Sequence, residues 1–186
     1  MKAVLHQICK SYGPTQVLDN LSLTLEGVTV LMAPSGQGKT TLARLLLGLE
    51  QPDSGRMEIT GHLVAQFQED RLCEHLTAVE NICLVLGKSG KNRAEQALKQ
   101  LGLEEQALKK PVCQLSGGQR RRVSLVRAML ADAEGVILDE PFKGLDADSR
   151  AMALEWVKQQ IQGRWILLIT HDKTEAEALG GTLLEW

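Results

Sequence analysis

The chain has 186 residues, of which 44% are hydrophobic and 24% charged, a balance typical of a globular protein with one domain or with a core carrying a small lobe. The formal net charge of −2 gives no electrostatic reason to expect a nucleic-acid partner. No apolar run approaches the length of a membrane span, and four widely spaced cysteines without a C-x-x-C pattern argue against a metal or disulfide framework.

Two strands are predicted near the N-terminus, at residues 2–9 and 21–25, joined by a turn-rich loop at 10–20. Leucines alternate with polar residues in the second strand, which suits an antiparallel strand with one wet face. The loop contains Tyr12, the only tyrosine of the chain. Its position leaves two interpretations open: the ring stacks on an adenine base, or it packs on the core.

An apolar run at 28–32 leads into a turn of small residues, Ala33-Pro34-Ser35-Gly36-Gln37-Gly38-Lys39-Thr40-Thr41, and then into a helix-like run. A buried strand, a small-residue turn and a helix form the context that a phosphate-binding loop requires. Gly36 and Gly38 allow successive N–H groups to point at one centre. The helix that follows adds the positive end of its dipole.

Two side chains of this loop have the chemistry to hold a nucleoside triphosphate. Lys39 can reach the β- and γ-phosphates, and the hydroxyl of Thr40 can ligate Mg²⁺. The stretch departs from the pattern G-x-x-x-x-G-K-[ST] at one position, because Ala33 replaces the first glycine. If that position requires a positive φ, the alanine costs of order 1 kcal/mol or more.

Two short strands are predicted next, at 56–60 and 62–67, and a polar cluster containing Gln68 follows them directly. A glutamine at such a strand end can orient water, complete a metal shell or be a plain loop residue. Residues 71–112 then read as a small helical lobe inserted into the α/β core. Its first helix begins with a capping box formed by Thr77 and Glu80.

Leu115-Ser116-Gly117-Gly118-Gln119 opens another helix, and a serine with two glycines at a helix N-terminus makes a second candidate anion site. The three arginines at 120–122 suit a solvated helix face or a lobe interface better than nucleic acid, given the negative net charge.

The last third of the chain carries two apolar strands that end on polar residues. The strand at 135–140 ends on Asp139 and Glu140, which is the Walker B arrangement of a phosphate-loop protein: Asp139 would hold Mg²⁺ and Glu140 could polarise the attacking water. The strand at 165–170 ends on His171, which could donate a hydrogen bond to the γ-phosphate or be structural. Helices at 149–161 and 174–179 and a final strand at 182–186 complete the prediction.

The order of phosphate loop, Gln68, Leu115-Ser116-Gly117-Gly118-Gln119, Asp139-Glu140, Asp146 and His171 resembles the ATP-binding-cassette (ABC) ATPases over essentially the whole chain. The resemblance implies a P-loop NTPase core with a mainly parallel sheet, an N-terminal antiparallel β subdomain and an inserted small α-helical subdomain. We therefore expect one ABC ATPase domain over 1–186, with 1–70 and 113–186 forming the α/β core and 71–112 the helical insert.

The resemblance also assigns roles to the motif residues. Glu140, His171 and Gln68 are implied to be catalytic, and Thr40, Gln68 and Asp139 to surround Mg²⁺. Tyr12 matches the adenine-stacking aromatic and Asp146 the D-loop aspartate. The residues implied to bind ATP are Tyr12, Pro34, Ser35, Gly36, Gln37, Gly38, Lys39, Thr40, Thr41, Ser116, Gly117, Gly118, Gln119 and Asp146. Of these, Ser116, Gly117 and Gly118 would bind the γ-phosphate of ATP held by a second subunit.

The sequence around Gln68 and the segment 76–81 are similar to bacterial importer ATPases, especially the nitrate, sulfonate and taurine group. We therefore expect an ATPase subunit in the cytoplasm, attached to the inner face of the membrane through a permease. The expected partners are a second ATPase subunit in a head-to-tail dimer, the permease and, indirectly, an extracytoplasmic solute-binding protein, with ATP and Mg²⁺ as cofactors and no nucleic acid. The alternatives are a non-transport ABC-type ATPase acting on nucleic acid or ribosomes, and a module that has lost catalysis through Ala33.

Overall fold

The structure is a computed structural model that describes residues 2–32, 34 and 36–185. The chain forms two compact units, each described by itself. The first consists of Met1–Ala65, Ala133–Asp139 and Gly163–Trp186, and the second of Gln66–Asp132 and Glu140–Gln162. The predicted division of the chain into a core and an insert at 71–112 stays a prediction.

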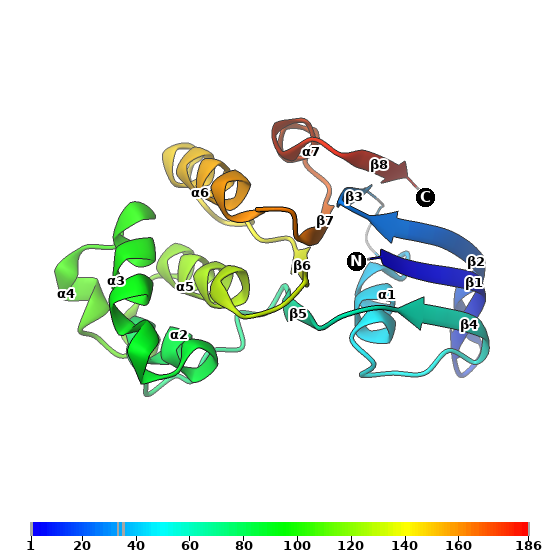
Figure 1. The fold of residues 1–186 in the computed structure, drawn as a ribbon, viewed down its shortest axis with the longest axis horizontal. Helices are drawn as coiled ribbons and strands as arrows, with labels where there is room; N and C mark the ends of the chain where they lie inside the picture. The colour runs from blue at the N-terminus through cyan, green and yellow to red at the C-terminus, as the bar shows by residue number, and fades with distance from the viewer. Residues whose placement is uncertain (1, 33, 35, 186) are drawn as a thin grey trace. The chain divides into compact units, whose positions relative to one another are not determined.

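The first unit contains two sheets (Figure 1). Strands β2 (Thr15–Glu26), β1 (Lys2–Tyr12) and β4 (Ser54–Ile59) form an antiparallel sheet in that order. A second sheet has the order β5-β6-β7-β3-β8, and its β6/β7, β3/β7 and β3/β8 pairs are parallel. Its strands are β5 (Leu63–Gln66), β6 (Gly135–Asp139), β7 (Trp165–Thr170), β3 (Val28–Met32) and β8 (Thr182–Glu185). The predicted mixture of a parallel sheet with an antiparallel N-terminal part is confirmed.

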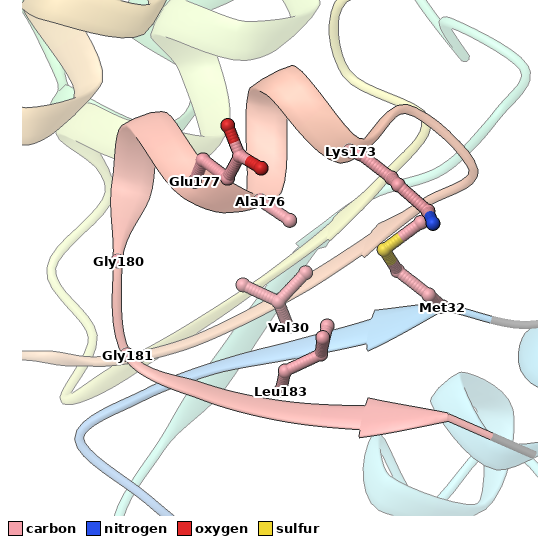
Figure 2. A pocket seen from close by; sticks show the side chains of 8 residues that line it. All are labelled: Val30, Met32, Lys173, Ala176, Glu177, Gly180, Gly181 and Leu183. Atoms are coloured by element: carbon pink, nitrogen blue, oxygen red, sulfur yellow. The ribbon is translucent and has the colours of Figure 1, made fainter.

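Helices α1 (Lys39–Leu46) and α7 (Lys173–Leu179) pack on opposite faces of the second sheet. Leu31 belongs to a buried cluster that also contains Leu42 and Leu45 of α1 and residues of the antiparallel sheet. The preceding residue of the strand, Val30, lies beneath α7 (Figure 2). Successive residues of a strand point to opposite faces, so β3 is covered on both sides. This accounts for its largely apolar sequence; the one polar residue, Thr29, is buried and donates from Oγ1 to the carbonyl oxygen of Glu26 at 3.2 Å.

The second unit is helical, with α2 (Ala78–Leu86), α3 (Lys91–Gln100), α4 (Glu105–Leu108), α5 (Gly117–Leu130) and α6 (Ala147–Gln160). Two short 3₁₀ turns lie at Lys88–Gly90 and Val112–Gln114. The predicted capping box at the start of α2 is confirmed, because Thr77 Oγ1 accepts from Glu80 N while a carboxylate oxygen of Glu80 accepts from Thr77 N. In the described part of the chain, no helix has both the length and the apolarity needed to cross a membrane.

The predicted loop at 10–20 is wrong. Strands β1 and β2 run on toward each other and are joined by a tight turn at Gly13 and Pro14, with Tyr12 paired to Thr15. The pairing of β1 with β2 shifts register after Leu5, after Ile8 and after Lys10, and Gln7 and Asn20 have positive φ. Each bulge interrupts the alternation of inward and outward side chains, so the strands look shorter in sequence than they are.

Candidate functional site

The phosphate loop lies between β3 and α1, as the sequence predicts. Gly36 and Gly38 have φ of 86° and 77°, a region that residues with a Cβ rarely adopt. At Gly38 packing adds a second reason for glycine, since a Cβ there would lie 2.7 Å from a methyl of Leu18 on β2. Ala33 and Ser35 lie outside the described residues.

The start of α1 is arranged to receive an anion. Its N-cap is Gly38, which offers no capping side chain, and its first turn contains no acidic residue. The N–H groups of that turn and the helix dipole can therefore serve a phosphate. Lys39, the first helical residue, donates from Nζ to the carbonyl oxygen of Pro34 at 2.7 Å, which holds its ammonium over the loop.

Thr40 and Asp139 lie together although 99 residues separate them in the sequence. Oγ1 of Thr40 donates to Oδ2 of Asp139 at 3.3 Å, and Asp139 is only 3% exposed. One carboxylate and one hydroxyl are hard oxygen donors that suit Mg²⁺, which usually completes its octahedron with water and substrate phosphate oxygens. The pair therefore fits the ion that the sequence predicts at this place.

His171 follows the strand between β3 and β6. The register pairs Met32 with Thr170 and Asp139 with Ile169, so β3, β6 and β7 end at the same edge of the parallel sheet. This edge brings the phosphate loop, Asp139 and His171 together. Ligands bind at the carboxyl ends of the strands in open α/β sheets.

Glu140 comes directly after Asp139 and has a positive φ of 51°. A glutamate in this region carries backbone strain of order 1 kcal/mol or more, and such strain concentrates at functional positions. Gln68 is exposed two residues beyond the end of β5. Both residues belong to the second compact unit, and their predicted roles stay predictions.

Tyr12 lies at the end of β1 and is 43% exposed, so its ring does not pack fully into the core. Its hydroxyl donates to a carboxylate oxygen of Glu50. The other oxygen of Glu50 accepts from Nη1 of Arg44 on α1 at 3.2 Å. Glu50 and Arg44 belong to no sequence motif, so the sequence alone predicts no role for either.

The segment at 115–119 begins α5, as predicted. Ser116 and Gln119 form a reciprocal capping box, with 3.2 Å from Gln119 N to Ser116 Oγ and 3.0 Å from Ser116 N to Gln119 Oε1. A Cβ built on Gly117 would have no atom of the described residues within 4 Å, apart from its chain neighbours and its own helix. The fold of the subunit therefore gives no steric reason for glycine at this exposed position.

Asp146 is the N-cap of α6. Its carboxylate accepts from the backbone N–H of Ser149 at 2.9 Å, and this hydrogen bond lowers the pKa of Asp146. The role expected of Asp146 rests on the family resemblance alone, and the cap is a finding of the structure.

The segment after Gln68 is held by polar side chains of α5. Arg121 pairs with Asp70 at 3.2 Å, Ser124 donates to the carbonyl oxygen of Asp70 at 3.0 Å, and Arg127 donates to that of Arg71 at 2.9 Å. Burial lowers the pKa of Arg127. The arginines of this helix thus serve contacts within the unit.

Asn81 of α2 fixes the next part of that segment. Its side chain is fully buried, accepts from Cys73 N at 2.8 Å, and donates to the carbonyl oxygens of Cys73 and Thr77 at 3.1 and 3.0 Å.

We expect Asn81→Leu to lower the free energy of unfolding by about 1–3 kcal/mol, because Cys73 N–H loses its acceptor. Urea denaturation measures this, with Asn92→Leu, at an exposed position of α3, as the control. Equal losses in both variants would contradict the assigned role of Asn81.

A pocket of about 390 Å³ lies between α7 and the strands β3 and β8 (Figure 2). Met32, the last residue of β3 before the phosphate loop, contributes to its wall, and Lys173 and Glu177 of α7 provide its charges. The pocket is lined by Val30, Met32, Lys173, Ala176, Glu177, Gly180, Gly181 and Leu183. No sequence motif predicts this pocket.

Comparison with known proteins identifies relatives of this arrangement. The family model described as ABC transporter matches residues 18–143. The aliphatic sulfonates import ATP-binding protein of Corynebacterium glutamicum is 38% identical over 98% of this chain and 79% of its own length. The Fe(3+) ions import ATP-binding protein of Brucella abortus is also 38% identical, over 95% of this chain, and the chain spans 56% of that relative's length.

The solved structures that resemble this chain are also ATP-binding cassettes. A dimeric ATP-binding cassette in a post-hydrolysis state bound to ADP and Pi superposes with a TM-score of 0.87 at 26% identity. The match covers 98% of this chain and 93% of the other. A dimeric bacterial ABC transporter cassette gives a TM-score of 0.85 at the same identity and coverage.

Proposed function

The chain belongs to the ABC transporter family, and we propose that it is the ATP-hydrolysing subunit of a bacterial importer, energising solute uptake through a separate permease. The observation that carries the proposal is the contact between Thr40 and Asp139 at 3.3 Å. It joins the phosphate loop to the end of β6 and places together two oxygen donors that would hold Mg²⁺.

Each motif residue has its own role in the proposed phosphoryl transfer. Lys39 neutralises the β- and γ-phosphates, while the N–H groups of the loop and of α1 hold the phosphate oxygens. Thr40 and Asp139, with Gln68, would hold Mg²⁺, which would screen the charge of the phosphates. Glu140 accepts the proton of the attacking water, and His171 donates to the γ-phosphate.

A second subunit completes the site in this proposal. Gly117 is exposed and has no steric role in the described part of its own subunit, which is expected if a ligand approaches its backbone from another chain. The N-terminus of α5 would then bind the γ-phosphate held by the partner through Ser116, Gly117 and Gly118. The cassette bound to ADP and Pi was solved as a dimer, which supports this arrangement.

The proposed partners are a second copy, permease subunits and, indirectly, an extracytoplasmic solute-binding protein. We place the subunit in the cytoplasm, attached to the inner face of the membrane through the permease. Relatives named as import ATP-binding proteins support transport over an action on nucleic acid or ribosomes. The presence of Lys39, Thr40, Asp139, Glu140 and His171 supports retained catalysis.

The proposal is tested by co-expressing the chain with a candidate importer permease of the same organism and reconstituting the complex in liposomes. We expect MgATP hydrolysis that rises when the solute-loaded binding protein is present, together with uptake of the solute. Glu58→Gln, on the exposed surface of β4, serves as a control that leaves both activities unchanged. Hydrolysis stimulated by DNA or ribosomes, with no association with the permease, would contradict the importer assignment.

A further inference from the structure

The end of β1 is tied to the segment that follows α1 by a group of polar contacts. Lys10 Nζ donates to Gln51 O at 2.9 Å and to Asp53 Oδ1 at 3.0 Å, and Ser11 N donates to Asp53 Oδ2 at 2.7 Å. Asp53 N in turn donates to Cys9 O at 2.9 Å. These bonds fix the backbone beneath Tyr12, but they leave the torsions of its ring free.

The hydrogen bond from Tyr12 to Glu50 restrains the ring itself. Glu50 cannot swing with the phenol, since Arg44 holds its other oxygen at 3.2 Å and Arg44 belongs to α1, the helix that begins at the phosphate loop. The side chains of Glu50 and Arg44 therefore connect the ring to the helix. The hydrogen bond from Tyr12, and after it the guanidinium of Arg44, lower the pKa of Glu50, so the acceptor is a carboxylate at neutral pH.

A cation also lies over the ring. The ammonium of Lys10 is 5.6 Å from the ring centroid, so a stacked base must use the opposite face. An exposed aromatic side chain loses rotamer freedom when a ligand stacks on it, and a ring already fixed avoids that cost.

We infer that Glu50 is a positioning residue for the nucleotide base: clamped by Arg44, it holds the ring of Tyr12 in the orientation that receives adenine. This inference rests on the proposed function, because it requires that Tyr12 stacks on the base of ATP. Glu50 itself touches neither base nor phosphate in this proposal and acts only through Tyr12.

The test compares a ligand that has a base with one that has none. Calorimetry measures the Kd of a non-hydrolysable ATP analogue and of inorganic tripolyphosphate, each with Mg²⁺, for the wild-type chain and its variants. We expect Glu50→Ala and Tyr12→Phe each to weaken binding of the analogue by about 3- to 10-fold, because each variant keeps the aromatic ring but removes the hydrogen bond that orients it. Tripolyphosphate binding should stay within twofold of wild type.

Two further variants separate positioning from a general structural effect. Glu50→Gln keeps an acceptor oxygen for the phenol and should restore most of the analogue's affinity. The double variant Glu50→Ala with Tyr12→Phe should bind the analogue no more weakly than either single variant, because both remove the same bond. Glu58→Ala, on the exposed surface of β4, is the charge-matched control and should change neither Kd.

Specific outcomes overturn the inference. Equal weakening of both ligands by Glu50→Ala would show that Glu50 acts through α1 and the phosphate loop instead. In a second overturning outcome, Glu50→Ala changes the affinity for neither ligand, while Tyr12→Ala lowers the analogue's affinity by about 5- to 150-fold. That result would refute the role of Glu50 but not the stacking of the base on Tyr12. If the wild-type chain binds neither ligand, the proposed function itself fails.

Discussion

Replacing Glu140 with glutamine is expected to lower the turnover of ATP by about 10²- to 10⁴-fold, the contribution of a positioned general base. Glutamine has nearly the same shape, so the unusual backbone at this position, with φ of 51°, places no new demand on the side chain. The amide cannot accept the proton of the attacking water. ATP binding depends on other groups and should remain.

The same variant should accumulate as an ATP-bound dimer, because closure would no longer be followed by hydrolysis. Phosphate release measures the turnover, and light scattering with and without MgATP measures the dimer. Glu58→Gln, which changes an exposed carboxylate of β4, should behave as wild type in both experiments. Steady-state hydrolysis at the wild-type rate in Glu140→Gln would show that another group is the base.

Replacing Lys39 with alanine should weaken ATP binding by at least about 30-fold, since it removes the cation that we propose to face the β- and γ-phosphates. The ammonium donates to Pro34 O at 2.7 Å, so the loop already holds it near the place where phosphate would lie. Calorimetry with the non-hydrolysable analogue measures the effect. The affinity for tripolyphosphate should fall to the same degree, because the lost contact is to phosphate and not to the base.

Lys88→Ala is the matched control, because this exposed lysine lies in the helical unit. Its Kd values for both ligands should equal those of wild type. Unchanged analogue binding in Lys39→Ala would exclude the phosphate loop as the nucleotide site.

The motif-bearing parts of the fold were predictable from sequence because their chemistry fixes their local structure. The loop containing Lys39 lies between strand and helix as expected, and the family drawn from the motif order is confirmed by the family model. Asp139 could be placed beside Thr40 because parallel strands end at one edge of their sheet.

Other features could not be read from the sequence. The bulges near Gln7 and Asn20 break the alternation on which strand prediction depends, so the sequence predicts a loop where the structure has a hairpin. Glu50 is a glutamate in a turn-rich segment, 38 residues from Tyr12, and only the folded chain brings their side chains together. A serine at a helix N-terminus suits both a helix cap and an anion site; the sequence predicts an anion site at Ser116, whereas the structure shows that Ser116 caps α5.

Because a tight turn joins β1 and β2, the number of residues before Tyr12 determines on which face of the ribbon its side chain lies. Tyr12 pairs with Thr15, and Ser11 pairs with Gln16, so only Gly13 and Pro14 separate the two strands. Adding or removing one residue between the last register shift and the turn would rotate the tyrosine to the other face of the ribbon. Insertions should therefore be tolerated at the turn's tip far better than inside β1, because the face of the ribbon on which Tyr12 lies depends on the number of residues before the turn.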